Sequence, residues 1–177
     1  MNAIFTDNIT DKLINYSRAY NYDIKLLKPV NSKFHFSFNK YLNYNDFLNY
    51  KKVIVVTDDN LICEKAFNFN NEDTIGVLRD TYSNKCSNVS MFVKAINVEF
   101  VTNNPINTDM IVYNNISQFV ALFQRIETFC KLVDKPYLFG LSGNKTTTPN
   151  FLSPGLEKEL FTYFCGDMYH GFKLHFL

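Results

Sequence analysis

The sequence predicts an α/β protein, a single three-layer domain over residues 1–177 in which a mixed, mostly parallel sheet has helices on both faces. Three observations indicate this class. Residues 53–56 form an unbroken run of β-branched side chains, which is typical of a strand covered on both faces. Residues 116–133 repeat apolar side chains at helical spacing. Strand and helix patterns alternate through the second half of the chain, and a length of 177 residues suits one domain.

The first half of the chain is expected to begin with a helix, for which Asp7 is a suitable N-cap, followed by a strand that ends at Pro29. Aromatic and polar side chains alternate in the segment KFHFSF, which predicts a half-buried strand. The segment EDTIGVLRDTY places Ile75, Leu78 and Tyr82 on one side of a helix. The elements expected here are a helix over about 7–20, strands over 22–30, 33–38 and 53–56, a short helix within 43–50 and a helix over 72–82.

The second half is expected to alternate strands with helices. Its clearest feature is the helix at 116–133, and Ser153 with Pro154 is typical of an N-cap followed by proline in the first turn of another helix. The elements expected here are a strand or hairpin over 91–102, strands over 110–114, 137–141 and 172–177, and helices over 116–133 and 155–164. No repeat or linker interrupts them, so one domain is predicted.

Charge and hydropathy restrict the expected partners. The net charge is +1, whereas nucleic-acid binders usually carry a basic excess, so nucleic acid is not an expected partner. No apolar run approaches the length of a membrane span, and the N-terminus lacks the pattern of a signal peptide. These features predict a soluble cytoplasmic protein without a membrane partner. The abundance of Asn, Lys, Tyr, Phe and Ile indicates an AT-rich coding sequence, which is common in large DNA viruses, phages and some AT-rich cellular genomes, and a viral protein in an infected host cell is one expectation.

Ligands of open α/β sheets bind beyond the carboxyl ends of the strands, and two loops are expected there. The first follows the strand at 53–56 and the second follows the strand at 137–141. The second loop fails the P-loop pattern, because two residues separate its glycines and Asn144 precedes Lys145. Its backbone N–H groups suit a phosphate, and the alternative is a simple polar turn. The candidate ligand-binding residues are Asp58, Asp59, Asn60, Gly140, Ser142, Gly143, Asn144 and Lys145.

Catalytic candidates are few. His35 lies on the polar side of its expected strand and titrates near neutral pH, and Asp58 is the carboxylate paired with it. Adjacent side chains on extended backbone point apart, so Asp58 and Asp59 are a poor pair for Mg²⁺. The three histidines are spaced too irregularly for a metal motif. The sequence therefore predicts neither a metal site nor a cofactor, and it leaves open whether the protein is an enzyme.

The order of elements over residues 51–177 resembles that of macrodomains, which are α/β proteins that bind ADP-ribose. The segments that carry the resemblance are VIVVTDD, FVKAINVEFVT, the helix at 116–133, PYLFGLSGN and FKLHFL. The resemblance implies that Gly140 to Lys145 wrap the diphosphate and distal ribose, and that Asp58, Asp59 or Asn60 contacts the ligand. The segment NLICEKAF has no glycine where the family has its first phosphate loop, and Asn144 stands where some members have a catalytic acid. Binding without strong catalysis is therefore implied.

The sequence is consistent with three functional hypotheses. The first is a macrodomain-like module that binds an ADP-ribose-like or other phosphorylated nucleotide. The second is a non-enzymatic accessory protein, viral in origin, that acts through an aromatic-rich interface with a protein partner or as a homo-oligomer. The third is a phosphodiesterase or nuclease that uses His35 with Asp58.

Overall fold

The computed structural model describes residues 1–29, 35–79, 106–131, 154–165 and 172–177. These residues form one sheet with the strand order β2-β1-β3-β5-β4-β6. The strands are β1 (Asn2–Thr6), β2 (Asp23–Leu26), β3 (Lys52–Val56), β4 (Thr74–Arg79), β5 (Ile106–Asn114) and β6 (Lys173–Phe176). β1 pairs in parallel with β2 and β3, and β4 pairs in parallel with β6. β5 is antiparallel to both of its neighbours, so the sheet is mixed and mostly parallel, as the sequence predicts.

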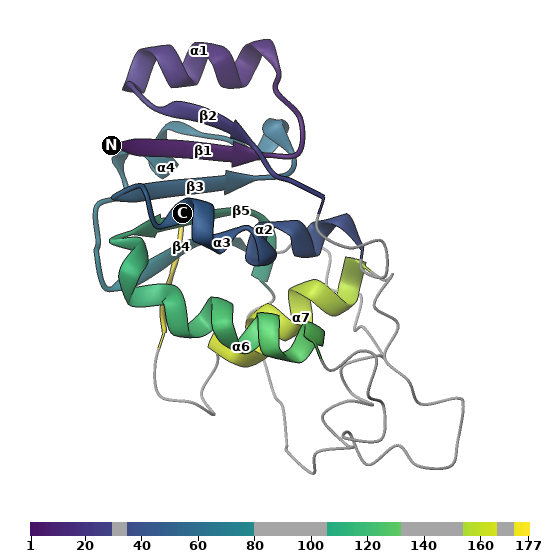
Figure 1. Ribbon diagram of the computed structural model, residues 1–177. Helices are drawn as coiled ribbons and strands as arrows, with labels where there is room; N and C mark the ends of the chain where they lie inside the picture. The colour runs from purple at the N-terminus through teal and green to yellow at the C-terminus, as the bar shows by residue number, and fades with distance from the viewer. Residues whose placement is uncertain (30–34, 80–105, 132–153, 166–171) are drawn as a thin grey trace, which may run out of the picture.

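Helices cover both faces of this sheet, which confirms the expected α/β class (Figure 1). They are α1 (Asp11–Tyr20), α2 (Asn39–Leu42), α3 (Tyr44–Phe47), α4 (Glu64–Asn68), α6 (Val120–Lys131) and α7 (Pro154–Cys165), with short 3₁₀ turns η1 (Phe36–Phe38), η2 (Asp59–Leu61) and η3 (Ile116–Phe119). None of the described helices combines the length and the hydropathy that a membrane crossing requires.

The alternation of side chains along each strand divides the core into two layers. Val53 and Val55 of β3 belong to a cluster that includes residues of α2, α3, α6 and α7, whereas Ile54 and Val56 belong to a cluster with residues of α1 and α4. All five residues of β3 are buried, which explains why its sequence shows no polar alternation. The first cluster is rich in aromatic rings, and Phe123 of α6 contacts three of them.

Several predicted elements are confirmed with shifted ends. The first helix begins at Asp11, and its N-cap is Thr10 in place of Asp7, because the Thr10 side chain accepts a hydrogen bond from the Leu13 N–H. The strands expected near 22–30, 53–56, 110–114 and 172–177 are β2, β3, β5 and β6. The expected helices at 43–50, 116–133 and 155–164 correspond to α3, to η3 with α6, and to α7. The elements expected at 91–102 and 137–141 lie outside the described residues.

The strand predicted over 33–38 is wrong in the part that the structure describes. Residues 36–38 form η1, and His35 caps it by accepting a hydrogen bond from the Ser37 N–H. Phe36 is 58% exposed, whereas Phe38 is fully buried. A capping side chain at the start of a turn competes with strand formation, and the alternating pattern does not reveal this competition.

The helix predicted over 72–82 is also wrong, because residues 74–79 form β4. Ile75 and Val77, two residues apart, enter the same cluster on one face of the sheet. Gly76 lies between them, and a Cβ atom there would lie 3.2 Å from Phe69 Cδ1 and 3.2 Å from Val112 Cβ. Close packing across the sheet therefore overrides the weak helical spacing. The sequence prediction also missed β1, a short strand whose residues Ala3 to Phe5 are buried on both faces.

Candidate active site at the carboxyl edge

The carboxyl ends of β1 and β3 lie side by side, because Thr6 of β1 pairs with Val56 of β3. β5 runs in the opposite direction, so its first residues lie at the same edge, where the Thr57 N–H donates to the Asp109 carbonyl at 2.8 Å. The arrowheads of β1 and β3 point toward α2 and toward the first residues of α7 (Figure 1). This region is called the carboxyl edge below, and it is where α/β sheets usually bind ligands.

A buried network of polar side chains from α2, β5 and α7 lies at this edge of the sheet. Lys40 of α2 and Glu157 of α7 are each 1% exposed, and Lys40 Nζ lies 3.3 Å from Glu157 Oε1. Lys40 Nζ also donates to the Thr108 carbonyl at 2.6 Å, and Thr108 Oγ1 donates to Glu157 Oε2 at 2.8 Å. The Tyr41 hydroxyl donates to Glu157 Oε1. The Lys40–Glu157 network, as these four residues are called, satisfies its charges internally, which is the condition under which buried ions are tolerated.

Asp7 lies beside this network, and one oxygen of its carboxylate has no partner in the described part of the chain. It follows β1 directly, and within the described residues its buried Oδ2 has no hydrogen-bond partner. Burial raises the pKa of Asp7, and the positive charge of Lys40 offsets part of that rise. A buried acceptor without a donor costs free energy, and such groups gather where a ligand or a reaction uses them. Asp7 is therefore the strongest candidate in the described chain for a group that contacts a ligand.

The outer part of the carboxyl edge carries a second, more exposed ion pair. Lys158 Nζ lies 3.2 Å from Asp109 Oδ2, and both side chains are about one-third exposed. Thr57 Oγ1 lies 3.3 Å from Asp109 Oδ1. Hydrogen-bond donors and acceptors from β5, from α7 and from the residue that follows β3 thus meet near the strand ends.

The three candidate residues after β3 form a turn. Asp58 accepts hydrogen bonds from the backbone and the side-chain amide of Asn60, each at 3.0 Å, so Asp58 caps η2. The Asp59 carbonyl accepts a hydrogen bond from Lys12 Nζ at 2.7 Å. Within the described ranges, no group of three or more His, Cys, Asp or Glu residues is arranged to hold a metal ion.

His35, the predicted catalytic histidine, lies near the Lys40–Glu157 network. Its Nδ1 is 2.8 Å from Ser37 Oγ. Burial lowers the pKa of His35, while the charge of Glu157 raises it and that of Lys40 lowers it. Its electrostatic partners are thus the network residues, whereas Asp58 bonds to Asn60. The phosphodiesterase pairing of His35 with Asp58 gains no support from this arrangement.

The second candidate loop lies outside the described residues. Gly140, Ser142, Gly143, Asn144 and Lys145 belong to it, and their part in a site stays a prediction. A pocket shared between this loop and residues 57–60 stays a prediction for the same reason.

Sequence reasoning missed the residues on which the site depends. Lys40, Tyr41, Thr108 and Glu157 come from three separate elements, and no local spacing connects them. Asp7 carried one usable signal. It directly follows the apolar segment AIFT, which would have marked it as a strand-end residue had β1 been recognised.

No family model matches the sequence, and no curated protein matches it. A glycosyltransferase involved in the glycosylation of the major capsid of PBCV-1 is similar over 99% of this chain and 82% of its own, with 10% sequence identity and a TM-score of 0.49. The apo form of mouse xyloside xylosyltransferase 1 is similar over 99% of this chain and 71% of its own, with 14% identity and a TM-score of 0.42.

These findings overturn the macrodomain interpretation. The similar solved structures are glycosyltransferases and not macrodomains, so the macrodomain-like fold and the ADP-ribose or nucleotide ligand inferred from it are wrong. The physical reason lies partly in β4, because the resemblance needed a helical segment after β3, where residues 74–79 form a strand. The accessory and phosphodiesterase alternatives are not better supported, and nothing found supports a viral accessory role.

Proposed function

We propose that this protein binds a carbohydrate at the carboxyl edge of its sheet and catalyses transfer of a glycosyl group to a hydroxyl of an acceptor. Asp7 carries this proposal, because its Oδ2 is a buried acceptor with no donor among the described residues. It occupies the strand-end position at which α/β proteins bind ligands. The two glycosyltransferases reported above only suggest which reaction to test first, since TM-scores below 0.5 are too low to support the assignment.

The chemistry of the edge suits a ligand rich in hydroxyl groups. Each sugar hydroxyl can donate one hydrogen bond and accept others, so it fits a surface on which both kinds of partner alternate. Asp7 offers an acceptor, and the partly exposed Lys158 and Thr57 lie at the same edge of the sheet. A sugar hydroxyl that donates to Asp7 Oδ2 would satisfy a buried acceptor that has no donor among the described residues.

Asp7 is suited to accept a proton during such a transfer. In this step the acceptor O–H gives its proton to the Asp7 carboxylate, and the oxygen forms a bond to the anomeric carbon of the donor sugar. The bond between that carbon and the leaving group breaks, and the leaving group takes the electron pair. Because burial raises the pKa of Asp7, its carboxylate is a stronger base than an exposed aspartate. The base must be ionised, so the rate should fall as the pH falls through this raised pKa.

The test is a comparison of Asp7→Asn with the wild-type protein. Saturation-transfer NMR with glucose, galactose, mannose and xylose measures binding, and incubation with the corresponding glycosyl fluorides and an alcohol acceptor measures transfer through fluoride release. We expect binding and transfer in the wild type, with the transfer rate reduced by roughly 100-fold or more in Asp7→Asn because the proton acceptor is lost.

Asp23→Asn is the matched control, because Asp23 begins β2 at the opposite edge of the sheet and is also partly buried. It should leave binding and transfer unchanged. Asp7→Asn should also raise the melting temperature at neutral pH, because it removes a carboxylate whose ionised form the fold disfavours. Equal transfer by wild type and Asp7→Asn, or no sugar binding by either, would refute the proposal.

A further inference from the structure

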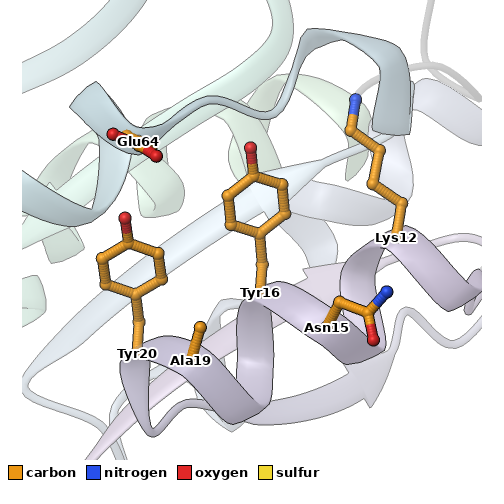
Figure 2. A pocket seen from close by; sticks show the side chains of 6 residues that line it. All are labelled: Lys12, Asn15, Tyr16, Ala19, Tyr20 and Glu64. Atoms are coloured by element: carbon orange, nitrogen blue, oxygen red, sulfur yellow. The ribbon is translucent and has the colours of Figure 1, made fainter.

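A groove lies between α1 and the first residue of α4, and two tyrosines of α1 line it. Its volume is about 640 Å³, and its lining residues are Lys12, Asn15, Tyr16, Ala19, Tyr20 and Glu64. Figure 2 shows the two tyrosine rings side by side on α1, with their hydroxyl groups directed toward the segment that carries Glu64. A groove of this size is within the range of ligand sites.

The two tyrosines present a flat surface because a third ring holds them. Tyr16 and Tyr20 lie four residues apart, and their ring centroids are 6.1 Å apart with an interplanar angle of 19°. The buried Phe67 ring stacks on both, at 5.1 Å and 9° from Tyr16 and at 4.3 Å and 11° from Tyr20. All three planes are therefore nearly parallel, and the tyrosines are fixed in place before any ligand arrives. Fixed aromatic side chains bind with little loss of conformational entropy.

The edges of this surface carry hydrogen-bonding groups. Asn15 and Glu64 are exposed. Partial burial raises the pKa of Tyr20, and the charge of Glu64 and the neighbouring Tyr16 raise it further, so the Tyr20 hydroxyl is protonated and can donate at neutral pH. An apolar floor with polar groups along its sides matches a sugar ring, which has C–H groups on its faces and hydroxyls around its rim.

The charges in the groove disfavour a nucleic acid. Among the residues that line it, Lys12 is the only cation, and its ammonium group donates to the carbonyls of Asp59 at 2.7 Å and Asn60 at 3.4 Å. Glu64 adds a negative charge to the rim. Single-stranded nucleic acids need a basic groove in addition to aromatic rings. The same Lys12 contact joins the groove to the turn that follows β3, so the groove begins next to the carboxyl edge.

We propose that Tyr16 and Tyr20 form a binding platform for two consecutive units of an oligosaccharide chain, separate from Asp7. The distance of 6.1 Å between the ring centroids is close to the length of one sugar unit, so each tyrosine faces one unit. This inference rests on the proposed function for its choice of ligand class. It places the oligosaccharide chain across α1.

Calorimetric titration with cellohexaose and with xylohexaose tests the platform. We expect the wild type to bind at least one of them, and Tyr20→Ala to bind it roughly tenfold more weakly or worse, as expected when one stacking contact is lost. Tyr20→Phe retains the ring and should keep most of the affinity. Ala19→Gln leaves the three stacked rings intact but introduces a larger side chain into the groove, so it should also weaken binding. It provides the test in case the Tyr20→Ala protein does not fold.

Arg18→Gln is the control on the same helix, because Arg18 is exposed and does not line the groove. It should bind like the wild type. Asp7→Asn should lose transfer but keep hexasaccharide binding, whereas Ala19→Gln should keep transfer to a simple alcohol, so failure of one proposal is distinguishable from failure of the other. Absence of hexasaccharide binding, or equal affinity in wild type and Ala19→Gln, would overturn the platform. Tighter binding of a thymidine hexanucleotide or a proline-rich decapeptide in the same groove would also overturn it.

Discussion

The side chain of Lys52 shows how one buried residue can make stability depend on pH. It lies on β3 and is 6% exposed. Its Nζ donates to the carbonyls of Phe67 at 2.6 Å and Phe69 at 2.5 Å, which are neutral partners. Because these carbonyls compensate only part of the lost hydration, burial lowers the pKa of Lys52 from 10.5 to about 8.

The lowered pKa predicts the direction of the effect. Between about pH 8 and pH 10.5 the unfolded chain binds more protons at this lysine than the folded chain does, so the free energy of unfolding rises with pH in this window. The contribution is complete above pH 10.5 and is lost as the pH falls through about 8. Lys52→Met removes the titration and keeps most of the apolar volume.

The measurement is urea unfolding of wild type and Lys52→Met at several pH values from 6 to 10.5. We expect the stability of the wild type to increase relative to Lys52→Met as the pH rises through 8. Other titrating groups are common to both proteins and cancel in the difference. A difference that does not change with pH would show that Lys52 has an ordinary pKa.

At the scale of single elements, the end of α1 depends on one residue in a left-handed conformation. Asn21 caps the helix with φ at 58° and ψ at 57°, and its N–H donates to the Ser17 carbonyl. This left-handed conformation is one that Asn tolerates and that Gly adopts without strain. Ser17 Oγ also donates to the Tyr22 carbonyl at 2.6 Å, so the chain turns directly from α1 into β2.

Two substitutions at Asn21 isolate this backbone effect. Asn21→Ala should destabilise the fold by about 1 kcal/mol, because a Cβ atom without a polar group is strained in the left-handed region. Asn21→Gly should be neutral or slightly stabilising, because glycine carries no such strain. Thermal unfolding of both variants beside the wild type gives the comparison. Equal stability of Asn21→Ala and Asn21→Gly would exclude backbone strain as the reason for Asn at this position.

At the scale of the whole molecule, the Lys40–Glu157 network joins segments far apart in the sequence. Lys40 and Tyr41 come from α2, Thr108 from β5 and Glu157 from α7. They lie at the edge of the aromatic cluster, where Tyr41 stacks on Phe161 with centroids 5.8 Å apart. Polar bonds and aromatic packing therefore act together to hold α2 and α7 against the sheet.

A double-mutant cycle measures this coupling. Glu157→Gln should destabilise the protein by roughly 3–5 kcal/mol, because it leaves the buried Lys40 ammonium without its ion-pair partner. Lys40→Met combined with Glu157→Gln should be more stable than Glu157→Gln alone, because the ammonium that Glu157→Gln leaves without its ion-pair partner is then absent, and Lys40→Met alone completes the cycle. Additive effects of the two substitutions, measured by urea unfolding, would show that the two groups do not stabilise each other.

The extent of sequence prediction differs between the core and the site. The α/β class, the strand at residues 53–56 and the helix around α6 follow from runs and spacings of apolar side chains, and the structure confirms them. The two wrong elements are the strand at 33–38, whose side chains alternate, and the helix at 72–82, whose helical spacing is weak. The local structure there depends on a capping hydrogen bond at His35 and on close packing around Gly76. The single-domain assignment and the residues of the loop at 140–145 stay predictions.

The sequence by itself determined the layered α/β architecture, because burial of apolar side chains repeats along the chain with the period of each element. Only the tertiary structure decided where chemistry is available. Asp7, Lys40 and Glu157 are polar residues in unremarkable local sequences, and the half-buried Asp7 comes near the buried Lys40 and Glu157 only when β1, α2 and α7 meet at one edge of the sheet. Burial, hydrogen-bond satisfaction and pKa depend on neighbours far away in the chain, which no local pattern records.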